Sequence, residues 1–214
     1  STLMRSSAAS DVYKRQIEPQ ASSACEVLYG TMDADKISRN VAECIYTGII
    51  HDTGVFKYSC TSKKTMEIAG EMMEKGIDYS DIIDNTFYKK TYVQNQILGR
   101  ALLESVLFYD GKCIFTTVTI DEMEFYGVTG RELGGIVEQL RLTDGVEVAI
   151  FLYQTGEEEY KVSLRSKKKI DVAAIATQFG GGGHVRAAGY TAKGSVYQII
   201  NSIGELIEKQ YNAM

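Results

Sequence analysis

Three residue types are almost missing from this sequence of 214 residues, which has one proline, no tryptophan and two histidines. With so little proline and with 44% hydrophobic residues, the chain is unlike those that stay disordered. Apolar runs that approach the roughly 18 residues of a membrane-spanning helix are also missing. The sequence therefore predicts a globular protein with one large or two small domains, and no membrane partner.

Positive charge is in the minority, because the formal net charge is -5. The chain as a whole is therefore not a polyanion binder, and a nucleic-acid ligand has to be small or held by a local basic patch. One basic run spans residues 161–169, with five basic side chains and no acidic one. Such a run is typical of a solvated strand and turn. It becomes a candidate binding patch because of the glycine-rich segment that follows it.

Cysteine pairs with metal-binding spacing are missing as well. No two of the four cysteines form a C-x-x-C motif; they are Cys25, Cys44, Cys60 and Cys113. This spacing indicates neither a zinc site nor a redox pair. Widely spaced, apolar-flanked cysteines are typical of reduced core residues, so we expect a cytoplasmic protein.

Residues 1–16 differ from the rest of the chain. They show no sustained periodicity, and Ser10–Gln16 resembles a translated sequencing adaptor. We therefore expect residues 1–16 to be a non-native leader and exclude them from the fold.

The region 17–108 has the patterns of helices. Ser23 and Glu26 form a capping-box pattern, and Gly54 is a natural terminator for a second helix. The expected apolar stripe of that second helix is Ile37, Val41, Ile45 and Ile49. A long helix over about 88–108 is a suitable connector between two lobes, which puts the predicted domain boundary near residue 109.

The region 109–214 alternates strands with helices, so the predicted class is α/β. The β-branched and aromatic runs predict strands at 113–120, 146–154 and 159–166. Helical patterns lie at 130–142, 171–179 and 194–211.

The run Gly180–Gly183, followed by His184 and Arg186, is the first candidate site. Glycines let main-chain N–H groups approach a phosphate without obstruction by a Cβ atom. Imidazole and guanidinium groups donate hydrogen bonds to phosphate oxygens. A flexible linker is the alternative, but linkers are usually serine-rich and this run interrupts strong helix and strand patterns.

His51-Asp52-Thr53-Gly54 is the second candidate. Asp52 beside a glycine turn could hold Mn²⁺ or Mg²⁺, which prefer oxygen ligands. Taken alone, the pattern is more typical of an ordinary turn. His51 could be a neighbour of the ion or simply pack.

Together these motifs resemble the DHH/DHHA1 phosphoesterase family. The sequence Gly-Gly-Gly-Gly-His-x-x-Ala-Ala-Gly at 180–189 is the hallmark of the DHHA1 domain, and Ser163–Ser166 and Asp171 also match it. Residues 47–57 resemble the fourth motif of the DHH domain, and 21–26 the segment before it. The similarity is closest to the NrnA-like bacterial oligoribonucleases that also dephosphorylate phosphoadenosine phosphate.

The resemblance implies a fold and a set of roles. Residues 17–108 would be a mostly helical part of a DHH domain, joined by the long connector helix to a mixed α/β DHHA1 domain at 109–214. Asp52 would be a catalytic ligand of a two-metal centre that holds Mn²⁺, or Mg²⁺. Substrate phosphates would be bound by Arg165, Gly180, Gly181, Gly182, Gly183, His184 and, less firmly, Arg186.

The expected substrate is short single-stranded RNA or DNA, or a small nucleotide such as phosphoadenosine phosphate. The sequence lacks the Asp-His-His triplet, so we expect an N-terminally truncated chain that is inactive by itself. Two alternatives stay open: a non-catalytic nucleotide- or RNA-binding module, and a relative of cyclic-dinucleotide phosphodiesterases. A homodimer is also open.

Overall fold

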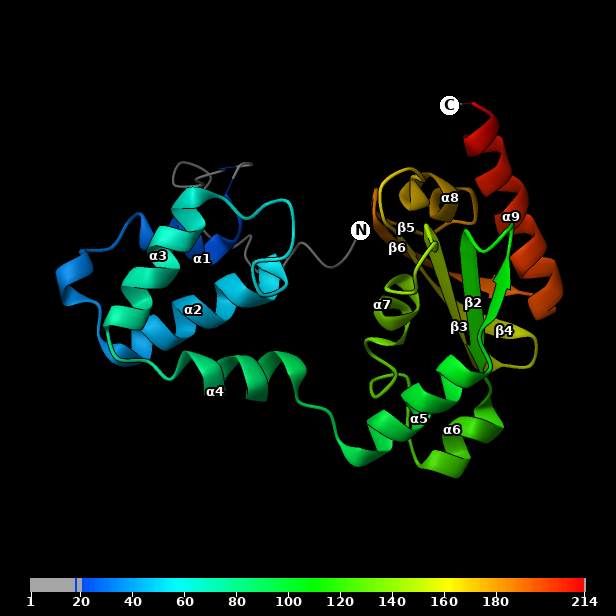
Figure 1. The fold of residues 1–214 in the computed structure, drawn as a ribbon. Coiled ribbons are helices and arrows are strands. Elements are labelled where there is room, and N and C mark those ends of the chain that lie inside the picture. The colour runs from blue at the N-terminus through cyan, green and yellow to red at the C-terminus, as the bar shows by residue number, and fades with distance from the viewer. Residues whose placement is uncertain (1–17, 19–20, 214) are drawn as a thin grey trace. The chain divides into compact units, whose positions relative to one another are not determined.

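The computed structural model describes residue 18 and residues 21–213, so the predicted leader over 1–16 lies outside the described residues. The chain divides into two compact units between Lys89 and Lys90. This division differs from the predicted boundary near residue 109, because the predicted connector helix packs within the second unit. Each unit is described by itself (Figure 1).

The first unit is helical. Its elements are α1 (Ala24–Tyr29), the 3₁₀ turn η2 (Ala34–Lys36), α2 (Arg39–Thr53), α3 (Lys63–Glu74), α4 (Tyr79–Ile83) and the π-turn η3 (Asp84–Tyr88). Its core is formed by Ile37, Ala42, Ile45, Tyr46, Ile49, Ile50, Ile68, Ala69, Met72 and Ile77. The predicted stripe was wrong at Val41, which is 38% exposed, whereas Ala42 and Tyr46, expected beside the stripe, are buried.

Two predicted helix ends of this unit can be compared with the structure. Ser23 caps α1 by accepting from the Glu26 amide, as the capping pattern predicts. The Glu26 carboxylate, however, accepts from Ser22 rather than from the Ser23 amide. Gly54 ends α2 in the left-handed conformation, as predicted.

The second unit is built on one six-stranded sheet. The strands are β1 (Val106–Phe108), β2 (Cys113–Val118), β3 (Val148–Gly156), β4 (Glu159–Ser166), β5 (Gly182–His184) and β6 (Ala187–Lys193). Their order is β1-β2-β3-β4-β6-β5, with β2 and β3 parallel and the other pairs antiparallel. This mixed sheet confirms the predicted α/β class.

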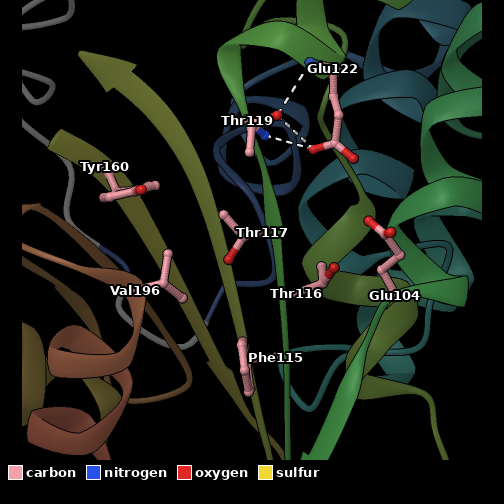
Figure 2. Close-up of a pocket in the computed structure, with 8 residues that line it drawn as sticks. All are labelled: Glu104, Phe115, Thr116, Thr117, Thr119, Glu122, Tyr160 and Val196. Atoms are coloured by element: carbon pink, nitrogen blue, oxygen red, sulfur yellow. Dashed lines mark hydrogen bonds between the residues drawn. The ribbon is translucent and has the colours of Figure 1, made fainter. Parts of the chain in front are cut away.

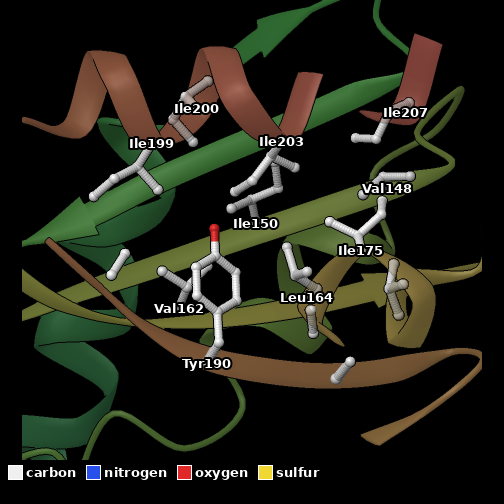
Figure 3. Packing of buried hydrophobic residues seen from close by; sticks show 14 of the residues in the cluster. Val148, Ile150, Val162, Leu164, Ile175, Tyr190, Ile199, Ile200, Ile203 and Ile207 are labelled. Atoms are coloured by element: carbon white, nitrogen blue, oxygen red, sulfur yellow. The ribbon is translucent and has the colours of Figure 1, made fainter. Parts of the chain in front are cut away.

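Helices cover the two faces of the sheet (Figure 1). One face packs with α5 (Tyr92–Leu103), α6 (Ile120–Tyr126) and α7 (Ile136–Arg141), and the other with α8 (Val172–Gln178) and α9 (Val196–Asn212). Figure 3 shows the second of these cores, where one row of isoleucines from α9 lies over the sheet. Successive side chains of each strand point to opposite faces of the sheet, and this alternation determines which residues of β4 lie on which face.

Candidate functional site

Three polar side chains of strand β4 lie on one face of the sheet. Val162 and Leu164 are buried in the core below α8 and α9. Because side chains alternate along a strand, Lys161, Ser163 and Arg165 point to the opposite face, on the side of α7.

Arg165 is held in a fixed orientation. Its Nε donates to Glu138 Oε1 on α7 at 2.5 Å, and its Nη1 donates to the carbonyl oxygen of Leu164 at 3.0 Å. Arg141 pairs with the other oxygen of Glu138, so one carboxylate anchors two arginines. The Arg165 Nη2 makes no hydrogen bond within residues 21–213 and is available to an anionic ligand, since the side chain is 28% exposed.

His184 lies in the same cross-strand row as Arg165. Arg165 pairs with Ala187 on β6, and Ala187 pairs with His184 on β5. Directly opposed residues share one face of a sheet, so the imidazole and the guanidinium point the same way. Their Cα atoms are two strand spacings apart, about 10 Å. The ring of His184 is exposed and makes no hydrogen bond to another described residue.

The glycine run is partly a turn and partly an edge strand. The amides of Gly180 and Gly181 donate to the carbonyls of Thr177 and Ala176, which end α8, at 3.1 and 2.9 Å. Gly182 and Gly183 pair with β6. The amides of Gly180 and Gly181 are therefore occupied at the end of α8, and any amide offered to a phosphate comes from the edge of β5 that faces away from β6.

Phe179 anchors the start of this turn. Its ring stacks on that of Tyr190 with 4.7 Å between centroids and 15° between planes. Burial raises the pKa of the Tyr190 hydroxyl. The turn is therefore tied to the core below α9 rather than hanging free as a linker would.

Arg186 has a different setting from the other candidate residues. It lies in the two-residue turn between β5 and β6, and its Nη1 donates to the carbonyl oxygen of Ile170 at 2.8 Å. This contact fixes the loop between β4 and α8. The guanidinium of Arg186 is thus engaged with the main chain, which leaves it fewer donors for a ligand.

A cavity of about 490 Å³ opens beside Arg165, and we call it the arginine pocket. Besides Arg165, its lining includes Lys161, Ser163, Tyr153, Gly189 and glycines of the segment before α7. The sequence placed Lys161 in a basic run and Ser163 in a matched motif, but it did not predict that both line one cavity with Arg165. The alternation Lys161-x-Ser163-x-Arg165 was the pattern that could have found them.

A second cavity, of about 480 Å³, lies at the C-terminal end of β2. We call it the threonine pocket, because Thr116, Thr117 and Thr119 line it. Figure 2 shows Glu104 and Glu122 beside it, with Glu122 accepting from Thr119. Arg100 pairs with both carboxylates, so this wall carries one net negative charge. That charge disfavours phosphate, whereas Lys161 and Arg165 make the arginine pocket positive.

Asp52 and His51 lie in the last turn of α2, and both are exposed. His51 Nε2 is 3.1 Å from Thr86 Oγ1, and its ring packs edge-on against Phe87. No group of three His, Cys, Asp or Glu side chains that could hold a metal ion occurs in the described part of the chain. These residues alone therefore do not fit a two-metal centre, for which Asp52 could supply only one carboxylate.

Comparisons with known proteins agree with this architecture. Residues 110–210 match the model of the DHHA1 domain. The chain is 27% identical over 178 residues to the bifunctional oligoribonuclease and PAP phosphatase NrnA of Bacillus subtilis, covering 81% of this chain and 56% of that protein. It is 29% identical over 181 residues to the NrnA of Thermus thermophilus, covering 83% and 53%.

A solved structure is also similar. It is that of an exopolyphosphatase-related protein from Bacteroides fragilis, with a TM-score of 0.83 and 27% identity, covering 90% of this chain and 58% of the other. The chain spans about half the length of the curated relatives it matches. No described helix is both long and apolar enough to cross a bilayer. Residues 110–210 of the second unit are therefore a DHHA1 domain, and the chain as a whole is similar to the proteins named NrnA.

Proposed function

We propose that the second unit binds the phosphates of short oligoribonucleotides or of 3′-phosphoadenosine 5′-phosphate, as the substrate-binding half of a phosphoesterase. The relatives named NrnA are oligoribonucleases and phosphatases, so the family is one of phosphoesterases. The observation that carries the proposal is the row Arg165–Ala187–His184 beside a cavity of about 490 Å³.

The chemistry of this row suits a phosphate. The guanidinium of Arg165 is pre-oriented by Glu138, so little freedom is lost when it binds an oxyanion. His184 can donate from a ring nitrogen, and the edge of β5 offers main-chain amides. Gly189 adds no side chain to the pocket, and a Cβ there would lie 2.8 Å from the carbonyl oxygen of Val162.

The proposal is tested by nucleotide binding to the whole chain. We expect Arg165→Ala to raise the Kd of a diribonucleotide about tenfold or more, since a hydrogen bond to a charged group contributes about 1.5–3 kcal/mol. His184→Ala is expected to weaken binding less. The matched control is Arg141→Ala. Arg141 also pairs with Glu138, so this variant removes an equivalent positive charge, but Arg141 does not line the pocket. Equal affinities for Arg165→Ala and Arg141→Ala would refute the assignment.

We also propose that Asp52 is a ligand of a two-metal centre that holds Mn²⁺, with Mg²⁺ as the alternative. Its remaining ligands would come from outside the described residues, since these contain no group of three side chains that could hold a metal ion. We therefore expect no Mn²⁺-dependent release of mononucleotides from a diribonucleotide by this chain alone. Hydrolysis by the isolated chain, retained in Asp52→Asn, would rule out this role for Asp52.

A further inference from the structure

A third cavity, of about 460 Å³, lies at the end of the sheet where β2 and β3 begin and β4 ends. We call it the lysine pocket, because Lys112, Lys167, Lys168 and Lys169 line it, together with Glu147 and Tyr211. Four lysines around one cavity are unexpected in a chain with a net charge of -5.

The pocket keeps most of this positive charge. Lys112, Lys168 and Lys169 form no ion pair among the described residues, and Lys167 Nζ donates a hydrogen bond to the Thr143 carbonyl at 3.0 Å. Glu147 is the one carboxylate in the lining, and one of its oxygens accepts the amides of residues 168, 169 and 170. An anion entering the pocket therefore meets three uncompensated lysines.

The lysine turn is also built rigidly. The amide of Lys167 donates to the Glu147 carbonyl at 2.9 Å, which continues the ladder one residue past β4. Ser166 Oγ donates to the Ile170 carbonyl at 2.6 Å and closes the turn. Glu147 thus fixes the main chain of the turn while the side chains of Lys168 and Lys169 stay exposed.

An aromatic ring completes the site. Lys112 Nζ lies 5.5 Å from the centre of the Tyr211 ring. Burial, with Glu147 and Cys113 nearby, raises the pKa of the Tyr211 hydroxyl, so this group stays protonated and can donate to a phosphate oxygen. Proteins that bind single-stranded nucleic acid combine basic side chains, which contact the phosphate backbone, with aromatic rings, on which bases stack. The half-buried Tyr211 among lysines offers both.

The lysine pocket lies beyond Arg165 along the direction of β4. Lys167 follows Arg165 by two positions on a ladder that stays paired, so the two Cα atoms are about 7 Å apart on the same side of the strand. The register places Lys112 and Glu147 beside Lys167. Two basic side chains, those of Arg165 and Lys167, therefore follow one another on this side of the strand and lead to the lysine pocket.

We propose that Lys112, Lys168, Lys169 and Tyr211 form a second binding site, for the backbone of single-stranded RNA that extends beyond the nucleotide held at Arg165. This inference rests on the proposed function of the arginine pocket. It adds that RNA of several nucleotides binds more tightly than a dinucleotide, because only the longer strand reaches the lysine pocket.

The test compares the binding of labelled RNAs of two and eight nucleotides to the whole chain, by fluorescence anisotropy at several KCl concentrations. The double variant Lys168→Ala/Lys169→Ala is expected to raise the Kd of the octamer about tenfold and leave the dinucleotide within twofold. Loss of two single-strand phosphate contacts lowers the slope of log K against log salt by about 1.4, at about 0.7 per contact.

Two further variants control for charge and folding. Lys36→Ala/Lys63→Ala removes the same charge from lysines whose side chains are 84% and 89% exposed in the first unit, and it should change neither affinity. Glu147→Gln keeps an oxygen for the three amides but removes the negative charge, so it should tighten octamer binding about threefold. Thermal unfolding checks that each variant is folded.

The outcomes separate the two proposals. An octamer that binds wild-type protein no more tightly than a dinucleotide overturns the lysine site and leaves the arginine pocket standing. Equal weakening of both RNAs by the double variant would also overturn the lysine site. So would displacement of the octamer by polyglutamate at equal charge, because that result would point to an acidic protein partner. Failure of the wild-type chain to bind the dinucleotide would instead overturn the proposed function.

Discussion

Gly183 is the glycine of the 180–183 run that combines a positive φ with a blocked Cβ position. Its φ of +149° lies in a region that L-residues rarely adopt, and a Cβ would lie 2.4 Å from the Ala187 carbonyl oxygen and 2.6 Å from Ala188 Cα. Gly182, by contrast, has no described atom within 4 Å of an added Cβ. The need for glycine here comes from the close pairing of β5 with β6.

Gly183→Ala is therefore expected to lower the free energy of unfolding by about 1–3 kcal/mol, or to detach β5 from the sheet. Gly182→Ala, one residue away, should cost less than about 1 kcal/mol. Urea unfolding followed by circular dichroism measures both. Equal losses in the two variants would mean that close strand pairing is not what requires glycine at 183.

For individual residues, the sequence predicted which side chains belong to a motif, but not which of them contact one another in the fold. The glycines, His184 and Arg165 could be singled out because they match a motif. Their common row could not, because Ala187-Ala188-Gly189 reads as a small-residue packing segment and β6 was not expected. Engagement of Arg186 with the Ile170 carbonyl depends on a tertiary contact that local patterns do not contain.

Glu26 is the residue that joins α1 to α3. It is 3% exposed, and its Oε2 accepts from Ser22 and from Thr65, which lies in the first turn of α3. Burial opposes its ionisation, but the hydrogen bonds from Ser22 and Thr65 and the charge of Lys64 outweigh it. The pKa of Glu26 is therefore held below its ordinary value of 4.5.

A carboxyl group whose pKa is lower in the folded state stabilises the fold above its ordinary pKa and loses that contribution as the pH falls through the folded value. We expect the first unit to lose stability below about pH 4.5, the ordinary value for this group. Glu26→Gln should cost about 2 kcal/mol at pH 7 and flatten this acid dependence. Thermal unfolding between pH 3 and 7 measures it, with the exposed Glu43→Gln as control. An unchanged acid profile in Glu26→Gln would contradict the argument.

Elements with long periodic patterns were predicted well, and short ones were not. The strands β2, β3 and β4 and the helices α8 and α9 lie close to their predicted ranges. β1 was read as the end of the preceding helix, and β5 as part of a loop, because three residues are too few to show alternation. α6 was missed because only its cap at Thr119 and Gly127 distinguishes it from the strand before it.

The two units have separate cores, and this decides where α5 belongs. Its apolar face was recognised in the sequence, but periodicity does not tell which core receives it. In the structure Ile97 and Ala101 are 0% and 1% exposed within the second unit, against Leu133, Ile136 and Leu140. The unit boundary therefore precedes α5.

Two fragments test this boundary. Residues 90–214 contain α5 and β1 and should unfold in one cooperative transition. Residues 109–214 lack both, which uncovers the partners of Ile97 and Ala101 and removes β1 from the edge of β2. We expect a loss of about 3–5 kcal/mol in the shorter fragment, since burying one large aliphatic side chain contributes about 1.5–3 kcal/mol and α5 also packs Val93 and Leu98 there. Equal urea midpoints for the two fragments would place the boundary at residue 109, and α5 would then be a connector.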